Sequence, residues 1–404
     1  MATATILDIE ELVAQNAEPV EVWEAIVKSA TLGRVSDIHV MAQADGVELA
    51  FRWDGDMHQQ GTMPMELGRR LISHVKTAAG IDLGEHRRPT EGRMKLAVDD
   101  RHIDLRISAI PTIHGQDMVV RIFDRTVSLM ELVDLGMLPR QMDYVNDMIQ
   151  RPHGLILVSG PTGSGKTTTL YSMLRQLTGD RRKVITIENP VEYDLDGVNQ
   201  TQVNPRIGVT FAVMLRAILR QDPDIIMVGE IRDEETAITA VRAANTGHLV
   251  LATTHATRAS RAVETMLSLG VHPYFLAVSL RGVIAQVLVK RICPTCKTAL
   301  PETADMIVDE RIRPHLHTEG PPCLYQGAGC PECFNTGYRG RTGLFELFLP
   351  NEQTKDLILR RASATELEHA MVQTNTLTLE EVGKLAAING QTTMEEIVNI
   401  LPAL

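Results

Sequence analysis

The stretch that decides the fold reads Gly160-Pro161-Thr162-Gly163-Ser164-Gly165-Lys166-Thr167-Thr168. It follows the apolar run 155–158 and precedes a segment with helical periodicity at 169–177. This order of strand, glycine-rich turn and helix is typical of the P-loop, whose backbone N–H groups surround the β- and γ-phosphates of a nucleotide. Lys166 neutralises the phosphate charge, Thr167 offers its hydroxyl to Mg²⁺, and the helix directs its positive end at the anion. The sequence therefore predicts a nucleotide-binding protein.

Strands and helices alternate on both sides of this stretch, from residue 154 to about residue 290. Short apolar runs typical of buried strands occupy 155–158, 184–187, 225–228 and 249–253. Segments with helical periodicity lie between them, near 210–220 and at 234–245. This rhythm predicts an α/β domain with a parallel sheet and helices on both faces. Ligands of such sheets bind at the carboxyl ends of the strands.

Two carboxylates directly follow strands of this predicted sheet. Glu188 comes after the run 184–187, and Glu230 comes soon after the run 225–228. A carboxylate there can orient the attacking water or hold Mg²⁺ through its hydration shell, the two tasks that phosphoryl transfer adds to the P-loop. An acid at a strand end is often only a helix cap, but two of them beside a P-loop favour a functional role. Glu230 is the stronger candidate for the base, and Glu188 stays open as the alternative.

Two histidines bracket the strand at 249–253. His248 precedes this strand, and His255 follows it after a pair of threonines. A single histidine is usually structural, but this pair bounds a strand beside the predicted site. We therefore expect both histidines to contact the γ-phosphate.

The residues that precede the P-loop domain predict a separate α+β domain. Two short helices are expected within 1–32, interrupted around 16–19, and the residues at 33–125 contain the alternation of a sheet. Periodicity then fades and charge rises, so we interpret 126–135 as a linker. The P-loop domain is expected to occupy 136–290.

Two arginines of the predicted α+β domain occupy neighbouring strands. Arg106 lies on the polar face of one strand, and Arg121 lies among apolar residues of the next. Their domain contains no phosphate-binding motif of its own. A structural role, in which Asp104 or Asp117 pairs with them, is the alternative to a functional one.

Four cysteines form two C-x-x-C pairs, Cys293 with Cys296 and Cys330 with Cys333. Four thiolates can close a tetrahedral Zn²⁺ site with no open position for water, which predicts a structural metal. The spacer of 33 residues exceeds the usual fifteen to about twenty residues, so we expect a loop excursion within it. Redox-active cysteines are the weaker alternative, because neither pair begins a thioredoxin-like βαβ unit. Cys323 is expected to be an ordinary thiol.

The cysteine module is expected to occupy 291–345, and the tail 346–404 to form a small helical domain. Three capping boxes support those helices: Ser363 with Glu366, Thr378 with Glu381, and Thr393 with Glu396. Packing or subunit contact is the expected role of this tail.

Charge and hydropathy limit the classes of partner. Forty basic against fifty-one acidic residues give a net charge of -11, which argues against nucleic acid as the default partner. No apolar window approaches the length of about eighteen residues that a membrane span needs, and the acidic start lacks the basic flank of a signal peptide. All five cysteines follow residue 292, a clustering that suits a metal site in a reducing compartment. We therefore expect a cytoplasmic protein.

Together these motifs resemble those of the secretion and pilus ATPases, the hexameric P-loop motors of type II secretion and type IV pili. Five blocks carry the resemblance: 36–39 with 51–55, the strands around Arg106 and Arg121, 160–168, 187–192 with 222–233, and 246–255. The cysteine pairs and the run 337–343 extend it toward the C-terminus. The resemblance implies a RecA-like P-loop ATPase domain after a PAS-like N-terminal domain, with ATP, Mg²⁺ and Zn²⁺ as cofactors.

The same resemblance assigns roles to individual residues. It implies that Glu188 belongs to the family's Asp box, Glu230 to its Walker B motif, and His248 and His255 to its His box. One departure is Asn189, which stands where the family usually has aspartate. Asn189 leaves Glu188 in place, so the departure affects only the fine tuning of the site.

Arg106 and Arg121 resemble arginines that reach the nucleotide from the N-terminal domain. The resemblance also implies a homohexamer that contacts the inner membrane through a platform protein. Assembly motors usually contain the four-cysteine module and retraction motors usually lack it, so assembly of a pilus or pseudopilus is the favoured function. A retraction or DNA-uptake pilus motor, a nucleotide-gated scaffold with little turnover, and a nucleic-acid translocase are the alternatives. Many assembly motors carry a further N-terminal domain, whereas only 1–35 precede the matching region here, which leaves the mode of membrane attachment open.

Overall fold

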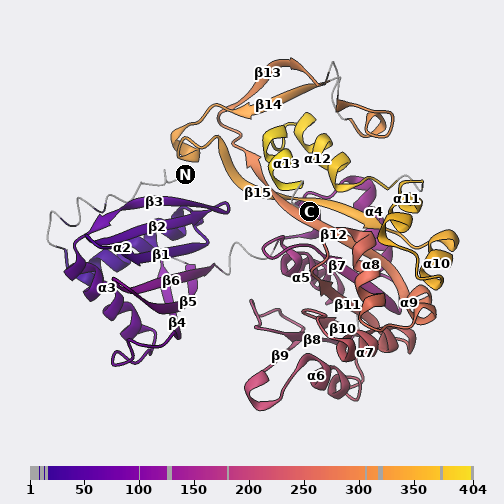
Figure 1. Cartoon of the computed structure of the whole chain (residues 1–404), viewed down its shortest axis with the longest axis horizontal. Coiled ribbons are helices and arrows are strands. Elements are labelled where there is room, and N and C mark those ends of the chain that lie inside the picture. Colours follow the sequence, from indigo (N-terminus) through magenta and orange to yellow (C-terminus); the bar gives the residue numbers. More distant parts are fainter. Residues whose placement is uncertain are drawn as a thin grey trace. The chain divides into compact units, whose positions relative to one another are not determined.

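The computed structural model describes residues 9, 13, 17–99, 101–124, 130–179, 182–304, 307–316, 322–373 and 376–401. The chain divides into two compact units, residues 1–128 and 129–404 (Figure 1). None of the helices in these described residues is long and apolar enough to cross a membrane.

The N-terminal unit contains a six-stranded antiparallel sheet with the order β3-β2-β1-β6-β5-β4. Its strands are β1 (Asp37–Ala42), β2 (Val47–Trp53), β3 (Asp56–Met63), β4 (Thr90–Val98), β5 (Arg101–Thr112) and β6 (Gly115–Asp124). The apolar side chains of the strands share one core with the helices α2 (Pro19–Leu32) and α3 (Met65–Ala78). The other of the two short helices expected within 1–32 falls mainly outside the described residues. This unit is the α+β domain that the sequence predicts.

Alternation along β5 decides which side chains enter this core. Ile103, Leu105 and Ile107 are buried, whereas Arg106 lies on the opposite face. Successive residues of a strand point to opposite faces, so the arginine cannot share the core with its neighbours. The N-terminal sheet therefore has an apolar face covered by helices and a polar face rich in charge.

The second unit contains a seven-stranded sheet with the order β15-β12-β7-β11-β10-β8-β9. Its strands are β7 (Gly154–Ser159), β8 (Val184–Glu188), β9 (Asn199–Gln202), β10 (Ile225–Val228), β11 (Leu249–Thr254), β12 (Leu280–Ile292) and β15 (Tyr338–Phe348). All neighbours are parallel except β15, which runs antiparallel to β12. The four strands expected from the sequence are confirmed, and β9, β12 and β15 are additions to them.

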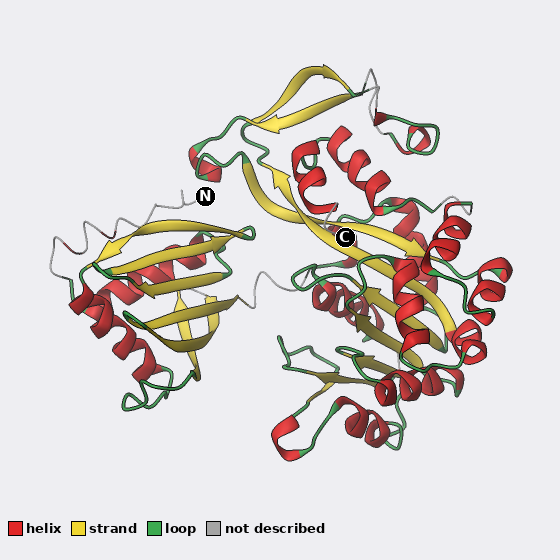
Figure 2. Ribbon diagram, in the orientation of Figure 1, coloured by secondary structure: helices red, strands yellow, loops and turns green. Residues whose placement is uncertain are grey.

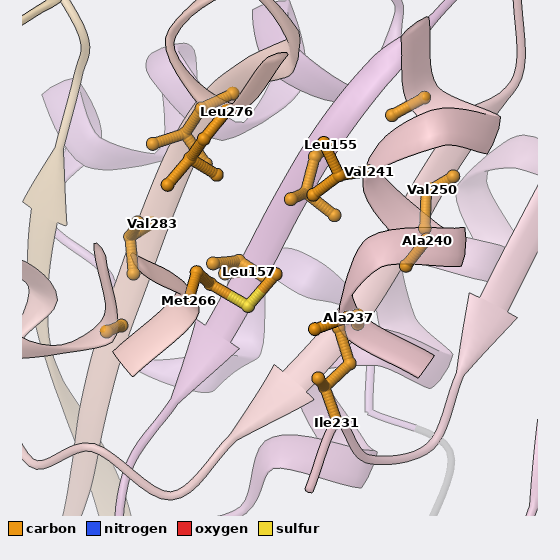
Figure 3. Packing of buried hydrophobic residues seen from close by; sticks show 14 of the residues in the cluster. Leu155, Leu157, Ile231, Ala237, Ala240, Val241, Val250, Met266, Leu276 and Val283 are labelled. Carbon is orange, nitrogen blue, oxygen red and sulfur yellow. The ribbon is translucent and has the colours of Figure 1, made fainter. Parts of the chain in front are cut away.

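Helices cover both faces of this sheet (Figure 2). One face packs against α4 (Pro139–Ile149) and α5 (Lys166–Leu177), and the other packs against α6 (Phe211–Ile218), α7 (Glu234–Asn245), α8 (Ala259–Ser268) and α9 (Pro273–Ser279). Figure 3 shows Leu155 and Leu157 of β7 among side chains of α7, α8 and α9. The intervening Ile156 and Val158 belong to the core on the α5 side. Burial on both faces explains why β7 is apolar throughout.

The cysteine module is not separated from the sheet. β12 continues from the sheet to Ile292, next to Cys293, and β15 returns from the module into the same sheet. Between them lies the two-stranded hairpin of β13 (Lys297–Thr303) and β14 (Cys323–Gly327). The predicted boundary after residue 290 therefore falls inside β12, because a strand belongs to the sheet it pairs with rather than to the motif that follows it.

The C-terminal helices divide between two cores. The helices α10 (Glu352–Leu359) and α11 (Ala364–Val372) join the core of α7 to α9, whereas α12 (Leu379–Ile388) and α13 (Met394–Ile400) pack on β12 and β15. The capping boxes of α11 and α12 are formed as expected. At α13, Thr393 caps the helix, but the buried Glu396 accepts from the backbone N–H of Lys290 at 3.1 Å. Glu396 thus ties α13 to β12.

Candidate functional site

A cavity of about 460 Å³ lies at the carboxyl edge of the second sheet. It is lined by the P-loop residues 162–168, by residues that follow β8, β10 and β11, and by Leu288 and Arg341 from β12 and β15. Parallel strands direct their carboxyl ends to the same edge, so residues distant in the sequence meet there. This is the location that the strand pattern predicts.

Glycines at two P-loop positions allow the backbone path. A Cβ at Gly160 would lie 2.3 Å from the carbonyl oxygen of Gln286, so only glycine fits there. Gly165 has a φ of 87° and forms the N-cap of α5, which begins at Lys166. The first N–H groups of the helix therefore face the cavity, as in other anion-binding helix termini.

The Lys166 ammonium donates hydrogen bonds to the carbonyls of Gly160 at 2.7 Å and Pro161 at 2.9 Å. Burial lowers the pKa of Lys166, and the negative charge of Glu230 partly opposes that shift. Thr167 lines the same cavity beside Lys166. A hydroxyl and nearby carboxylates are hard oxygen ligands, the kind that Mg²⁺ prefers. These residues fit a Mg²⁺–nucleotide complex.

Glu230 is accessible from the cavity. Its side chain is 18% exposed, and its Oε2 lies 2.7 Å from Nη2 of Arg232 and 3.6 Å from Nε2 of His255. The hydroxyl of Thr253 donates to the carbonyl of Gly229 at 2.5 Å and links the ends of β11 and β10. The structure therefore brings Glu230 and His255 together beside the P-loop.

Glu188 also lines the cavity, but it is only 3% exposed. Its carboxylate accepts hydrogen bonds from the side chains of Tyr171, Thr186 at 2.6 Å and Gln200 at 3.0 Å. Burial, together with the hydrogen bond to Glu188, raises the pKa of Tyr171, which is neutral at physiological pH. The oxygens of Glu188 are engaged by neutral donors, whereas Glu230 faces the cavity.

The structure does not bring His248 to this site. His248 lies before β11, and its Nδ1 is 3.0 Å from the carbonyl oxygen of Ala243 in α7. Each residue of a strand advances about 3.3 Å, so the two ends of the six-residue β11, five steps apart, are separated by about 16 Å. His255 stands at the carboxyl end and His248 at the amino end, and one phosphate cannot contact both within one chain. The γ-phosphate contact expected of each histidine stays a prediction, and of the two it is His255 that lines the cavity beside the P-loop.

Arg106 and Arg121 occupy directly opposed positions of β5 and β6 in the N-terminal unit. Arg121 donates from Nε to Oδ1 of Asp37 on β1 at 2.8 Å. The Arg106 guanidinium stacks on the ring of Phe123 with its Cζ 4.3 Å from the ring centroid. Asp117 accepts instead from a backbone N–H of β1 at 2.8 Å. The partner of Arg121 is therefore Asp37, a residue that the sequence did not suggest.

The two C-x-x-C pairs meet in space. The sulfurs of Cys293, Cys296, Cys330 and Cys333 all lie within 4.8 Å of one another, with separations of 3.7 to 3.8 Å for three of the pairs. Tetrahedral zinc with Zn–S bonds of about 2.3 Å requires sulfurs about 3.8 Å apart. The donor set and its spacing fit structural Zn²⁺. Cys323 lies on β14, apart from this cluster.

Sequence reasoning missed several polar residues around the cavity. Gln286 is buried in β12 and donates to the carbonyl of Ser164 at 2.7 Å. This hydrogen bond fixes the backbone of the P-loop to the neighbouring strand. A lone glutamine within the apolar run of β12 was the available signal for it. Arg341 and the Tyr171–Gln200 pair depend on contacts between strands far apart in the sequence, and no local pattern marks them.

Comparisons with known proteins agree with this geometry. Residues 13–399 match the model of the family described as type II/IV secretion system protein. The type II secretion system protein E of Klebsiella pneumoniae is 40% identical over 398 residues, 98% of this chain and 78% of that protein. The type IV pilus assembly ATPase PilB of Thermus thermophilus is 38% identical over 395 residues, 97% of this chain and 43% of that protein.

Solved structures show the same fold. The pilus retraction motor PilT with bound ADP has a TM-score of 0.62 at 25% identity, covering 94% of this chain and 96% of that one. The ATPase DotB of Legionella pneumophila has a TM-score of 0.71 at 20% identity and covers 96% of each chain. The resemblance drawn from the motifs is confirmed, and the chain belongs to the type II/IV secretion system protein family.

Proposed function

We propose that this chain is a Mg²⁺-dependent ATPase whose hydrolysis of ATP powers assembly of a type IV pilus or a type II secretion pseudopilus. The observation that supports it most directly is the meeting of the P-loop with Glu230 and His255 in one cavity. Lys166 and the N–H groups at the start of α5 would bind the phosphates, and Thr167 would ligate Mg²⁺.

We assign to Glu230 the role of the base that activates the attacking water. A base must reach the cavity with an oxygen that can accept a proton: Glu230 is 18% exposed there, with its Oε2 also paired to Arg232, whereas Glu188 is only 3% exposed. Glu188 has its oxygens engaged by three side-chain donors. We therefore assign Glu188 a supporting role.

The motor role draws on the relatives as well as on the site. The relatives are named as components of type II secretion and as a pilus assembly ATPase. The four-cysteine cluster, which would hold one structural Zn²⁺, resembles the module of assembly motors. The working unit would be a cytoplasmic homohexamer that contacts the inner membrane through a platform protein. The order of the N-terminal sheet supports a PAS-like domain, from which Arg106 and Arg121 would reach nucleotide.

Steady-state ATP hydrolysis by the purified chain tests this function. Turnover that requires Mg²⁺ and is lost in Lys166→Ala supports an ATPase. Tight ATP binding without turnover would instead identify a nucleotide-gated scaffold. Turnover that rises strongly on addition of single- or double-stranded DNA would favour a translocase over a filament motor.

A further inference from the structure

A buried hydrogen-bond network joins the helix of the P-loop to the loop that begins at Glu188. The Tyr171 side chain projects from α5, five residues after Lys166, and is 1% exposed. Its hydroxyl donates to Oε2 of Glu188 and accepts from the backbone N–H of Glu192 at 3.3 Å. Glu188 and Glu192 line the cavity, whereas Tyr171 does not.

Gln200 of β9 completes the network. Its Nε2 donates to Oε1 of Glu188 at 3.0 Å and to the carbonyl of Tyr193 at 2.8 Å, and it lies 3.3 Å from the Tyr171 hydroxyl. Thr186 adds a hydrogen bond of 2.6 Å to Oε1 of Glu188. Three elements, α5, β8 and β9, thus each supply a side-chain donor to one carboxylate.

Such a network fixes the position of a buried charge. A carboxylate removed from water must have its oxygens satisfied, and hydrogen bonds to a charged acceptor are stronger than those to a neutral one. Within the part of the chain that the structure describes, the side chains that donate to Glu188 are the neutral Tyr171, Thr186 and Gln200, and these donors provide its stabilisation. Movement of the P-loop helix would therefore be transmitted to the loop at 188–192 through Tyr171.

We propose that Tyr171 is a positioning residue for the reaction: it holds Glu188 and the loop 188–192 in register with the P-loop, although it lies outside the cavity. This inference rests on the proposed ATP hydrolysis. Misplacing a group at an active site by about 1 Å can lower the rate a hundredfold. Tyr171 should thus affect kcat and leave the affinity for nucleotide largely unchanged.

The test compares Tyr171→Phe with Tyr144→Phe. The control removes a hydroxyl that accepts from Arg140 at 3.1 Å on α4, outside the network. We expect Tyr171→Phe to lower kcat about ten- to a hundredfold with the KM for ATP within about threefold, and Tyr144→Phe to match the wild type. A lowered melting temperature with unchanged kcat would show that Tyr171 is only a core residue.

A double-mutant cycle with Glu188→Gln separates action through Glu188 from other effects. If Tyr171 acts through Glu188, the double variant will be no slower than the slower single variant, because both changes disrupt one unit. Multiplicative losses would overturn the proposal. Should Tyr171→Phe fail to fold, Gln200→Met on the edge strand β9 removes another donor to Glu188 and should produce the same selective loss of kcat; wild-type kcat in that variant would contradict it. A wild-type chain without turnover would instead overturn the ATPase function itself.

Discussion

Oε2 of Glu230 lies 3.6 Å from Nε2 of His255, so the acid that follows β10 faces the histidine that follows β11. Thr253 and Gly229 hold the two strand ends together through a hydrogen bond of 2.5 Å. An imidazole at this distance can help to orient the carboxylate, and a small shift would bring the two groups into direct hydrogen-bond contact. We therefore expect the reactivity of Glu230 to depend on His255.

His255→Ala should lower kcat by about a hundredfold, the lower end of what a positioned acid–base side chain contributes, because it removes the imidazole that stands 3.6 Å from Oε2 of Glu230. The KM for ATP should change little, because the P-loop remains intact. His248→Ala is the matched control, since His248 lies at the opposite end of β11. Steady-state kinetics of both variants measure the difference. An equal loss of kcat in His255→Ala and His248→Ala would contradict a special role for the histidine beside Glu230.

Protein purified without chelator should contain close to one zinc per chain by elemental analysis. Cys293→Ser or Cys330→Ser should lose the metal and lower the melting temperature, because structural zinc contributes directly to folding. Cys323→Ser should retain full zinc content, since Cys323 lies outside the cluster. Metal-free protein with an unchanged melting temperature would contradict the assignment.

Arg106→Ala and Arg121→Ala should depress ATP turnover far more than nucleotide affinity. The proposed reason is that these arginines stabilise charge on the transferring phosphoryl group, as arginine fingers do. Arg70→Ala is the control, because Arg70 pairs with Glu18 at 2.5 Å on exposed helical surface. Kinetics and size-exclusion chromatography should be run together. Normal hydrolysis by both variants in intact rings would mean that Arg121 serves only to pair with Asp37.

Arg258→Ala should destabilise the second unit by about 3 to 5 kcal/mol, the usual cost of leaving a buried charge without its partner. Arg258 contacts Glu346, which is 2% exposed, and also pairs with Glu380 of α12. Lys355→Ala breaks an exposed pair with Glu352 and should cost less than about 1 kcal/mol. Thermal unfolding measures the loss of stability in Arg258→Ala and in Lys355→Ala. Similarly small losses of stability in the two variants would show that the backbone N–H groups of Ala259 and Leu379, which donate to Glu346, are enough to stabilise its charge.

Local patterns allowed most of the site to be predicted. The P-loop, the acids at strand ends and the C-x-x-C pairs are short segments whose chemistry is complete within a few residues. Glu230 could be found because an apolar strand leads almost directly into it. The sequence shows that His248 and His255 each adjoin the same strand, whereas the fold decides which end of that strand lies beside the P-loop.

The remaining features depend on pairing between distant segments. Gln286 reaches Ser164 across 122 residues, and Arg341 enters the cavity because β15 pairs with β12. The predicted module boundaries cut through these strands for the same reason. The engagement of Glu188 by Tyr171 and Gln200 needs β8, β9 and α5 to be assembled first. The hydrophobic periodicity of a single segment does not indicate contacts between segments that are distant in the sequence.

The most direct test of the account is ATP hydrolysis by Glu230→Gln compared with Lys166→Ala. The amide keeps the shape of the side chain but cannot accept the proton of the attacking water. Glu230→Gln should therefore still bind ATP, while its turnover falls by roughly two to four powers of ten. Lys166→Ala should instead lose nucleotide affinity. Near-wild-type turnover by Glu230→Gln would contradict the account and transfer the role of the base to Glu188.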